Sequence, residues 1–160
     1  MHLGGLAIGL TKYKLGEFIE LVLDTNSKLL YGPNDVIGMT ITKETIPTKA
    51  DVSGTDLSKF LAVYPGEFIY NPRTHGKRIG FGYNDTNSNF IFSWNNIAFK
   101  IRETMHTIVL ADYLFLHFKR DEWDREAFFS LGGVPPKCFR GMLFVIWRLN
   151  FRHFLFNKNI

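Results

Sequence analysis

The chain has 160 residues, of which 46% are hydrophobic, and a formal net charge of +4. This length and apolar content suffice for one domain with a buried core and are not typical of disordered chains. A single cysteine, Cys138, excludes an internal disulfide framework, and no run approaches the roughly 18 apolar residues of a membrane span, so we expect a soluble cytoplasmic protein with no membrane partner.

The positive charge is unevenly distributed along the chain. Five cations and no acid lie in residues 134–160, which leaves 14 basic and 15 acidic residues in 1–133. The greater part of the chain is therefore close to neutral, and the total charge alone is weak support for nucleic-acid binding.

The N-terminal third predicts one helix and several short strands. An amphipathic helix is expected over 14–23, because apolar residues recur there at helical spacing, namely Leu15, Phe18, Ile19 and Val22. Strands are expected at 36–42 and 46–52, the second at a sheet edge or a bend because Pro47 cannot donate to a ladder. Asp56 should cap one helical turn over 57–60, just before a strand at 61–63.

Residues 68–85, FIYNPRTHGKRIGFGYND, contain two β-type runs around a polar loop. Cations crowd this loop with no acid among them, namely Arg73, His75, Lys77 and Arg78. A β scaffold fixes side chains that a free loop would leave mobile, and cations held in this way suit an anionic polymer. The first functional hypothesis is therefore nucleic-acid binding.

The second β-type run, 78–83, alternates large apolar residues with Gly80 and Gly82. This pattern predicts one packed face and one bare backbone face, where another surface can approach closely. Further strands are expected at 90–92 and 97–101, followed by a helix capped by Asp112 and running to 119, and a second helix at 123–129. Strands followed by helices favour an α+β fold over a doubly wound parallel fold.

Patterns that carry catalysis are missing from the sequence. There is no Walker phosphate-binding loop, no zinc-type Cys/His spacing and no pair of carboxylates near an expected cleft. Asn71-Pro72-Arg73 begins like the Asn-Pro-Pro-aromatic signature of adenine amino-methyltransferases but lacks its second proline and its aromatic residue. Gly80 and Gly82 lie inside a β-type run and do not open a helix, so we do not expect a methyl-donor site. Catalysis by this chain alone is not expected.

Residues 12–133 resemble the target-recognition domain of the specificity subunit of type I restriction-modification enzymes. The resemblance rests on segments that occur in the order of that family: KYKLGEFIE (12–20), IPTKADVSGTDLSKF (46–60), PGEFIYNPRT (65–74), GKRIGFGYND (76–85) and DYLFLHFKRDEWDR (112–125). On this basis 1–11 is an N-terminal extension, 12–133 the recognition domain, and 134–160 an atypical tail.

The resemblance implies an α+β domain that lies on double-stranded DNA and reads one half of a split target. Methyltransferase subunits would then methylate adenine and a restriction subunit would cut unmethylated DNA. S-adenosylmethionine, ATP and Mg would serve those partner subunits, whereas this chain would bind no cofactor or metal and supply no catalytic group.

The DNA-contacting candidates all carry hydrogen-bonding or cationic side chains: Asn71, Arg73, His75, Lys77 and Arg78, followed by Thr48, Lys49 and Ser93. The guanidinium and ammonium groups can donate to guanine O6/N7 or to phosphate, and Asn71 can pair with adenine. An Asx turn before Pro72 explains Asn71 equally well, and turn chemistry is the alternative for Thr48, Lys49 and Ser93. A solvated loop position explains His75 equally well, and the other histidines are expected to be structural or at the surface.

The family pattern ends near Gly133, where the chain continues as VPPKCFRGMLFVIWRLNFRHFLFNKNI. Residues 134–160 contain no acid, unlike the rest of the chain, which suggests a reading-frame slip. The codons available for 134–142 agree with this, because the neighbouring frame can encode Ser-Thr-Ala-Glu-Val-Phe-Ser-Trp-Asp. We then expect a truncated specificity subunit, and sequencing the gene across these codons tests the expectation. A family-like continuation missing from every neighbouring frame would refute it.

Two other classes of function are compatible with the sequence. One is a restriction endonuclease or methyltransferase fragment with its own activity. The other is a protein-interaction module in which the helical hairpin at 112–129 docks a partner, or else a non-functional remnant.

Overall fold

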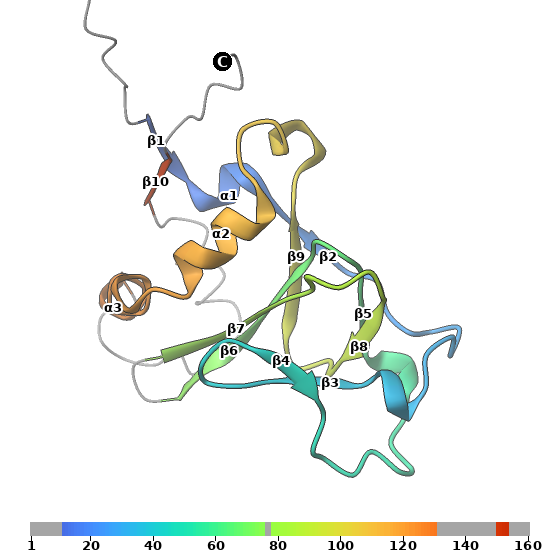
Figure 1. Ribbon diagram of the computed structural model, residues 1–160. Helices are drawn as coiled ribbons and strands as arrows, with labels where there is room; N and C mark the ends of the chain where they lie inside the picture. Colours follow the sequence, from blue (N-terminus) through green and yellow to red (C-terminus); the bar gives the residue numbers. More distant parts are fainter. Residues whose placement is uncertain (1–10, 76–77, 131–149, 154–160) are drawn as a thin grey trace, which may run out of the picture.

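The computed structural model describes residues 11–75, 78–130 and 150–153 (Figure 1). Only the backbone is described for 11–13, 73–75, 130 and 150–153. A strand-rich body is followed by two helices, α2 (Ala111–Phe118) and α3 (Asp121–Ser130). The predicted α+β class is confirmed.

The centre of the fold is an antiparallel sheet with the strand order β2-β9-β6-β7. Its strands are β2 (Ile19–Val22), β9 (Ile97–Ile101), β6 (Phe68–His75) and β7 (Arg78–Tyr83). Phe68 lies opposite Tyr83 on one side and Phe99 on the other, so β6 is flanked on both sides. The two strands that frame the candidate segment are thus integral parts of the central sheet.

The helices cover one face of this sheet (Figure 1). Phe81 on β7 stacks on Phe118 of α2 with ring centroids 4.6 Å apart, and Trp123 of α3 packs edge-on against the same Phe81 ring. The single-turn helix α1 (Leu15–Phe18) adds Leu15 and Phe18 to this core. Each large buried ring removes apolar area from water and anchors the helices on β6 and β7.

Short strands cover the opposite face of the sheet. They form two antiparallel pairs, β3 (Ile37–Met39) with β4 (Thr45–Pro47) and β5 (Leu61–Val63) with β8 (Phe90–Phe92). Ile69 of β6 packs here with Val63, Phe90 and Phe92. Helical 3-10 turns lie at Pro33–Asp35, Leu57–Lys59 and Glu103–Met105, and the Asp56 carboxylate caps the second of them as predicted.

The bare face expected at Gly80 and Gly82 is occupied by the chain itself. A Cβ atom on Gly80 would lie 3.0 Å from Met39 Sδ, and one on Gly82 would lie 3.0 Å from Thr45 Cγ2. The β3–β4 hairpin therefore packs directly on the backbone of β7, and a larger residue at either position would require the Met39 or Thr45 side chain to shift. The close approach predicted from the glycines is present, but it is made by the chain's own hairpin, and Gly80 also borders a small surface hollow.

The helix predicted over 14–23 is wrong. Only one helical turn forms, and the chain then enters β2, where Ile19 pairs with Ile101 and Val22 with Ala98. Residues three apart in a strand point to opposite faces, and both Ile19 and Val22 are buried. Tertiary pairing with β9 therefore buries the same apolar residues that the helical spacing explained.

The polar loop predicted between the two β-type runs is mostly strand. β6 continues to His75, which lies opposite Arg78, and its register against β7 shifts between Tyr70 and Thr74. Pro72 lies within this irregularity, where a residue without an N–H group does not interrupt the ladder. Arg73, His75 and Arg78, predicted to lie on a loop, therefore belong to strands β6 and β7 of a β-hairpin.

The cap predicted at Asp112 is also wrong. α2 begins after Leu110, and the Asp112 carboxylate instead accepts a hydrogen bond of 2.8 Å from the Tyr83 hydroxyl. Strand β10 (Asn150–His153) pairs with β1 (Thr11–Lys14), while the rest of the predicted tail and residues 1–10 of the predicted extension lie outside the described residues. Within the described part of the chain, no helix has the length and apolar character needed to cross a membrane.

Candidate nucleic-acid interface

Two of the predicted contact residues meet at one surface hollow. Asn71 on β6 and Arg78 at the start of β7 both line a hollow of about 110 Å³. Its other walls come from Gly80, from Met39 at the end of β3, and from Thr40 and Ile41 in the connection to β4. Asn71 is half-buried and Arg78 is exposed, so an amide and a guanidinium group border the same opening.

Two other cations of the predicted cluster, Arg73 and His75, lie on the same hairpin. The backbones of Arg73 and His75 belong to β6, close in sequence to Asn71. Their side chains, and all of Lys77, lie outside the described residues. Arg73 and His75 thus belong to the hairpin, but the DNA contacts of their side chains stay predictions.

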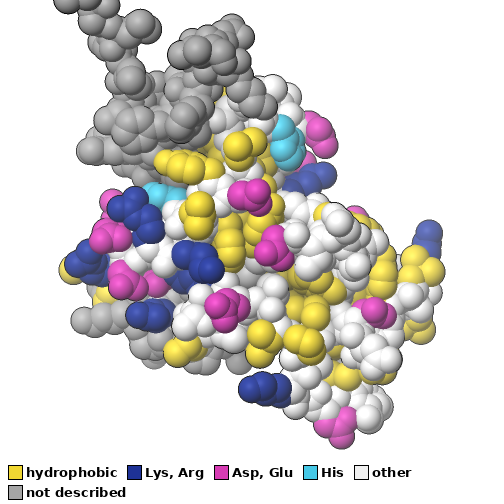
Figure 2. Space-filling model, in the orientation of Figure 1, with side chains coloured by type: hydrophobic (Ala, Val, Ile, Leu, Met, Phe, Trp, Pro, Cys, Tyr) yellow, Lys and Arg dark blue, Asp and Glu magenta, His cyan; other side chains and the backbone are white. Residues whose placement is uncertain are grey.

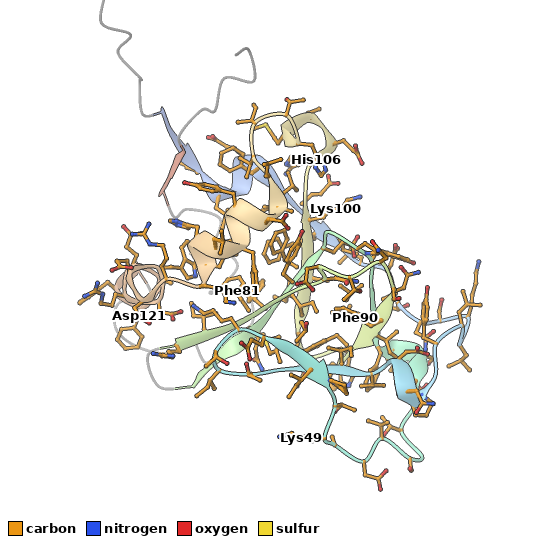
Figure 3. All side chains as sticks on the ribbon, in the orientation of Figure 1. Lys49, Phe81, Phe90, Lys100, His106 and Asp121 are labelled. Atoms are coloured by element: carbon orange, nitrogen blue, oxygen red, sulfur yellow. The ribbon has the colours of Figure 1, made fainter. Side chains whose placement is uncertain are left out.

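Thr48, Lys49 and Ser93 do not line this hollow. Thr48 Oγ1 accepts a hydrogen bond of 3.2 Å from the Ala50 N–H, and Ser93 Oγ lies 2.7 Å from Asn95 Oδ1. Both side chains therefore have the turn chemistry that was the alternative explanation for them. Lys49 is exposed and follows the end of β4, away from the helices (Figure 3).

The Arg78 side chain has an acidic neighbour on α3. Arg78 Nη2 lies 3.5 Å from Asp121 Oδ1, and both side chains are exposed. The first turn of α3 carries two further acids, Glu122 and Asp124. An exposed pair of this kind contributes little to stability, so Arg78 can leave Asp121 for an anionic ligand at small cost.

A buried ion pair behind the hollow was not predicted from the sequence. Lys43 Nζ lies 2.8 Å from Asp124 Oδ2, and their side chains are only 3% and 7% exposed. The same ammonium group donates to the Phe118 carbonyl at 2.5 Å, and Asp124 Oδ1 accepts from the Ile79 N–H at 3.2 Å. Burial lowers the pKa of Lys43, while the hydrogen bond to Asp124 opposes this change.

This ion pair connects three elements at one point. Lys43 comes from the β3–β4 connection, Asp124 from α3, and Ile79 from β7 directly beside Arg78. Nothing local in the sequence distinguishes Lys43 from a solvated lysine, since its partner is 81 positions away. The pair fixes both walls of the hollow against the helices.

The turn after β8 lies at the same end of the sheet as Asn71. Ile97 pairs with Tyr70, so Asn96 and Asn71 are both one residue beyond this pair. Hydrogen bonds hold the turn, with Asn96 Nδ2 donating to the Ser93 carbonyl at 3.0 Å and to Asn95 Oδ1 at 2.9 Å. The turn presents Trp94, which is 64% exposed, and aromatic side chains of this kind are common at binding surfaces.

The described surface does not carry a continuous basic patch on the face in view. Figure 2 shows Lys and Arg side chains interspersed with acidic ones on that face. Lys100 and Arg102 both lie within ion-pair distance of Glu20, at 3.5 and 3.7 Å. The described residues contain no group of three or more His, Cys, Asp or Glu side chains placed to hold a metal ion.

His117 should make stability depend on pH. It is half-buried against Trp123, and burial, with a smaller effect of Arg120, lowers its pKa to about 4. The unfolded chain, with a histidine pKa of about 6.5, binds more protons between pH 4 and 6.5. The contribution of neutral His117 to the free energy of unfolding is therefore fully present above about pH 6.5 and is lost as the pH drops toward 4.

Between about pH 6.5 and pH 4 the free energy of unfolding should fall by about 1–2 kcal/mol because of His117, after allowance for its partial exposure. Urea unfolding of the His117→Gln variant at pH 7.5 and pH 4.5 should show a smaller difference than the unmodified chain. His106→Gln changes an exposed histidine and serves as the control. An equal pH difference in all three proteins would contradict the assignment.

Comparisons with known proteins do not assign the chain to a family. No protein-family description matches the sequence, and no curated protein matches it at a significant level. Support for the function therefore comes from the residues themselves and from the geometry around Asn71 and Arg78.

Proposed function

We propose that the chain is a sequence-specific DNA-binding domain of the kind found in type I restriction-modification specificity subunits. It would read one half of a split target in double-stranded DNA. Methyltransferase and restriction subunits would supply the chemistry, with S-adenosylmethionine, ATP and Mg, and this chain would be non-catalytic. The observation that carries the proposal is that Asn71 and Arg78 line the same hollow, at one end of the central sheet.

These two side chains match the donor and acceptor pattern of base edges in the major groove. A carboxamide can donate to N7 and accept from N6 of adenine at the same time, and a guanidinium can donate to guanine O6 and N7. Each well-placed contact of this kind gives about 1–3 kcal/mol of discrimination between bases. Two contacts from one hairpin, with Arg73 and His75 on the same strand, support recognition of a short half-site.

The charge distribution limits how such a domain would bind. Residues 1–133 have 14 basic and 15 acidic side chains, so non-specific attraction to phosphate is weak. Base contacts and the partner methyltransferase would then account for most of the affinity. We expect a shallower dependence of affinity on salt than for a basic DNA-binding domain of the same size.

Selection from a pool of randomised duplexes tests the proposal. The full chain is used with and without a type I methyltransferase subunit, and bound duplexes are sequenced. The expected result is enrichment of one short half-site, clearer in the presence of the partner. Enrichment of no sequence in either condition would refute specific recognition, and cleavage or methylation by the purified chain alone would favour the enzyme alternative.

Removal of Asp121 gives an independent check on the role of Arg78. The Asp121→Asn variant removes the acid 3.5 Å from the guanidinium, so affinity for the selected duplex should rise about two- to five-fold. Fluorescence anisotropy at fixed salt measures the change. Glu20→Gln removes a comparable partner of Arg102 and should leave the affinity unchanged. Unchanged affinity of the Asp121 variant would indicate that Arg78 does not contact DNA.

A second candidate function is docking of a partner protein on the C-terminal helices. Three apolar side chains are exposed here: Leu110, just before α2, at 61%, Leu116 of α2 at 63% and Phe129 of α3 at 76%. Exposed apolar side chains on neighbouring elements are typical of interaction sites when they form one patch. Binding to DNA that weakens with salt would support recognition, whereas salt-insensitive association with a protein partner alone would support docking.

A further inference from the structure

Ile41 occupies an unusual position for an exposed aliphatic residue. It lies in the connection between β3 and β4, is 61% exposed, and borders the same hollow as Asn71 and Arg78. A single exposed isoleucine is common at protein surfaces and by itself indicates nothing. Here Ile41 and Met39 supply apolar lining to a hollow that Asn71 and Arg78 also line.

The connection that carries Ile41 is held in place from both sides. Thr40 N–H donates to the Glu44 carbonyl at 2.9 Å, Lys43 N–H donates to the Thr40 carbonyl at 3.1 Å, and the Thr40 and Thr42 hydroxyls lie 2.7 Å apart. Lys43 has a φ of 65°, and its side chain enters the buried pair with Asp124. Ile41 lies two residues before Lys43 and so belongs to a turn that is held in place. A fixed turn reduces the entropy lost when a ligand binds.

The lining of the hollow fits the major-groove edge of one type of base pair better than that of the other. In the major groove an A·T pair offers the adenine N7 acceptor and N6 donor beside the thymine C5-methyl group, whereas a G·C pair offers no methyl group. We infer that the hollow takes the major-groove edge of an A·T pair, with Asn71 toward adenine and Ile41 against the thymine methyl group. This inference rests on the proposed function and specifies which base pair the site reads.

Deoxyuridine substitution tests the methyl contact directly. Starting from the duplex selected by the full chain, each thymine is replaced in turn by deoxyuridine, which removes only the methyl group. At one position the unmodified chain should bind about five-fold more weakly. At that position the Ile41→Ala variant should bind both duplexes equally, because the side chain that contacts the methyl group is absent.

The control and the outcomes separate this inference from the proposed function. Leu30→Ala removes another exposed aliphatic side chain, 73% exposed and outside the hollow, and should keep the five-fold difference. A selected duplex in which no thymine methyl group matters, or in which the Ile41→Ala variant keeps the difference, overturns the inference and leaves DNA recognition standing. Enrichment of no sequence in the selection overturns both.

Discussion

Replacing Lys43 by alanine is expected to lower the free energy of unfolding by about 3–5 kcal/mol. The substitution leaves the Asp124 carboxylate buried, with a side chain 7% exposed, and without the ammonium group 2.8 Å away. It also removes the donor to the Phe118 carbonyl. An uncompensated buried charge is among the costliest defects in a folded domain, and typical domains have only about 5–15 kcal/mol in total. Urea unfolding at pH 7.5 measures the loss.

Two further variants make the result specific to the buried pair. Lys43→Met combined with Asp124→Asn removes both charges and keeps a carbonyl acceptor for the Ile79 N–H, so its stability should lie within about 1–2 kcal/mol of the unmodified chain. Asp121→Asn breaks the exposed pair with Arg78 and should cost less than about 1 kcal/mol. A loss below about 1 kcal/mol for Lys43→Ala would show that the pair does not bear on folding.

Replacing Asn71 and Arg78 together by alanine is expected to abolish preference for the selected half-site. Loss of two base contacts, each about 1–3 kcal/mol, weakens binding by roughly 30-fold to 10⁴-fold. Binding to an unrelated duplex should change far less, because phosphate contacts carry no sequence information. Anisotropy titrations of both duplexes give the ratio of affinities, which is the quantity that the substitution should collapse.

A matched arginine provides the control for this experiment. Arg102 also faces an acid, with Nη1 3.7 Å from Glu20 Oε2, and its side chain is 42% exposed against 49% for Arg78. It does not border the hollow, so Arg102→Ala should keep the preference for the half-site. If the double variant keeps that preference while its thermal unfolding is unchanged, the contacts lie elsewhere on the domain.

Local patterns in the sequence were sufficient for much of the secondary structure. The strands predicted at 61–63, 90–92 and 97–101 are present, and so are the Asp56 cap and the α+β class. In each case a short apolar run is bounded by turn residues, or a side chain bonds to a backbone two residues away. Interactions of such short range are visible in the order of residues.

Only the tertiary structure decided which residues meet at the hollow. Helical spacing at 15–22 was overridden by pairing of β2 with β9, and the face left bare by Gly80 and Gly82 was filled by the β3–β4 hairpin. Lys43 and Asp124 are 81 positions apart, and their ion pair helps to hold the hairpin that brings Ile41 to the same hollow as Asn71 and Arg78. The sequence by itself determined where several of the strands and turns form, since those depend on neighbouring residues. The contacts between distant segments depend on how the sheet and helices pack, which no local pattern encodes.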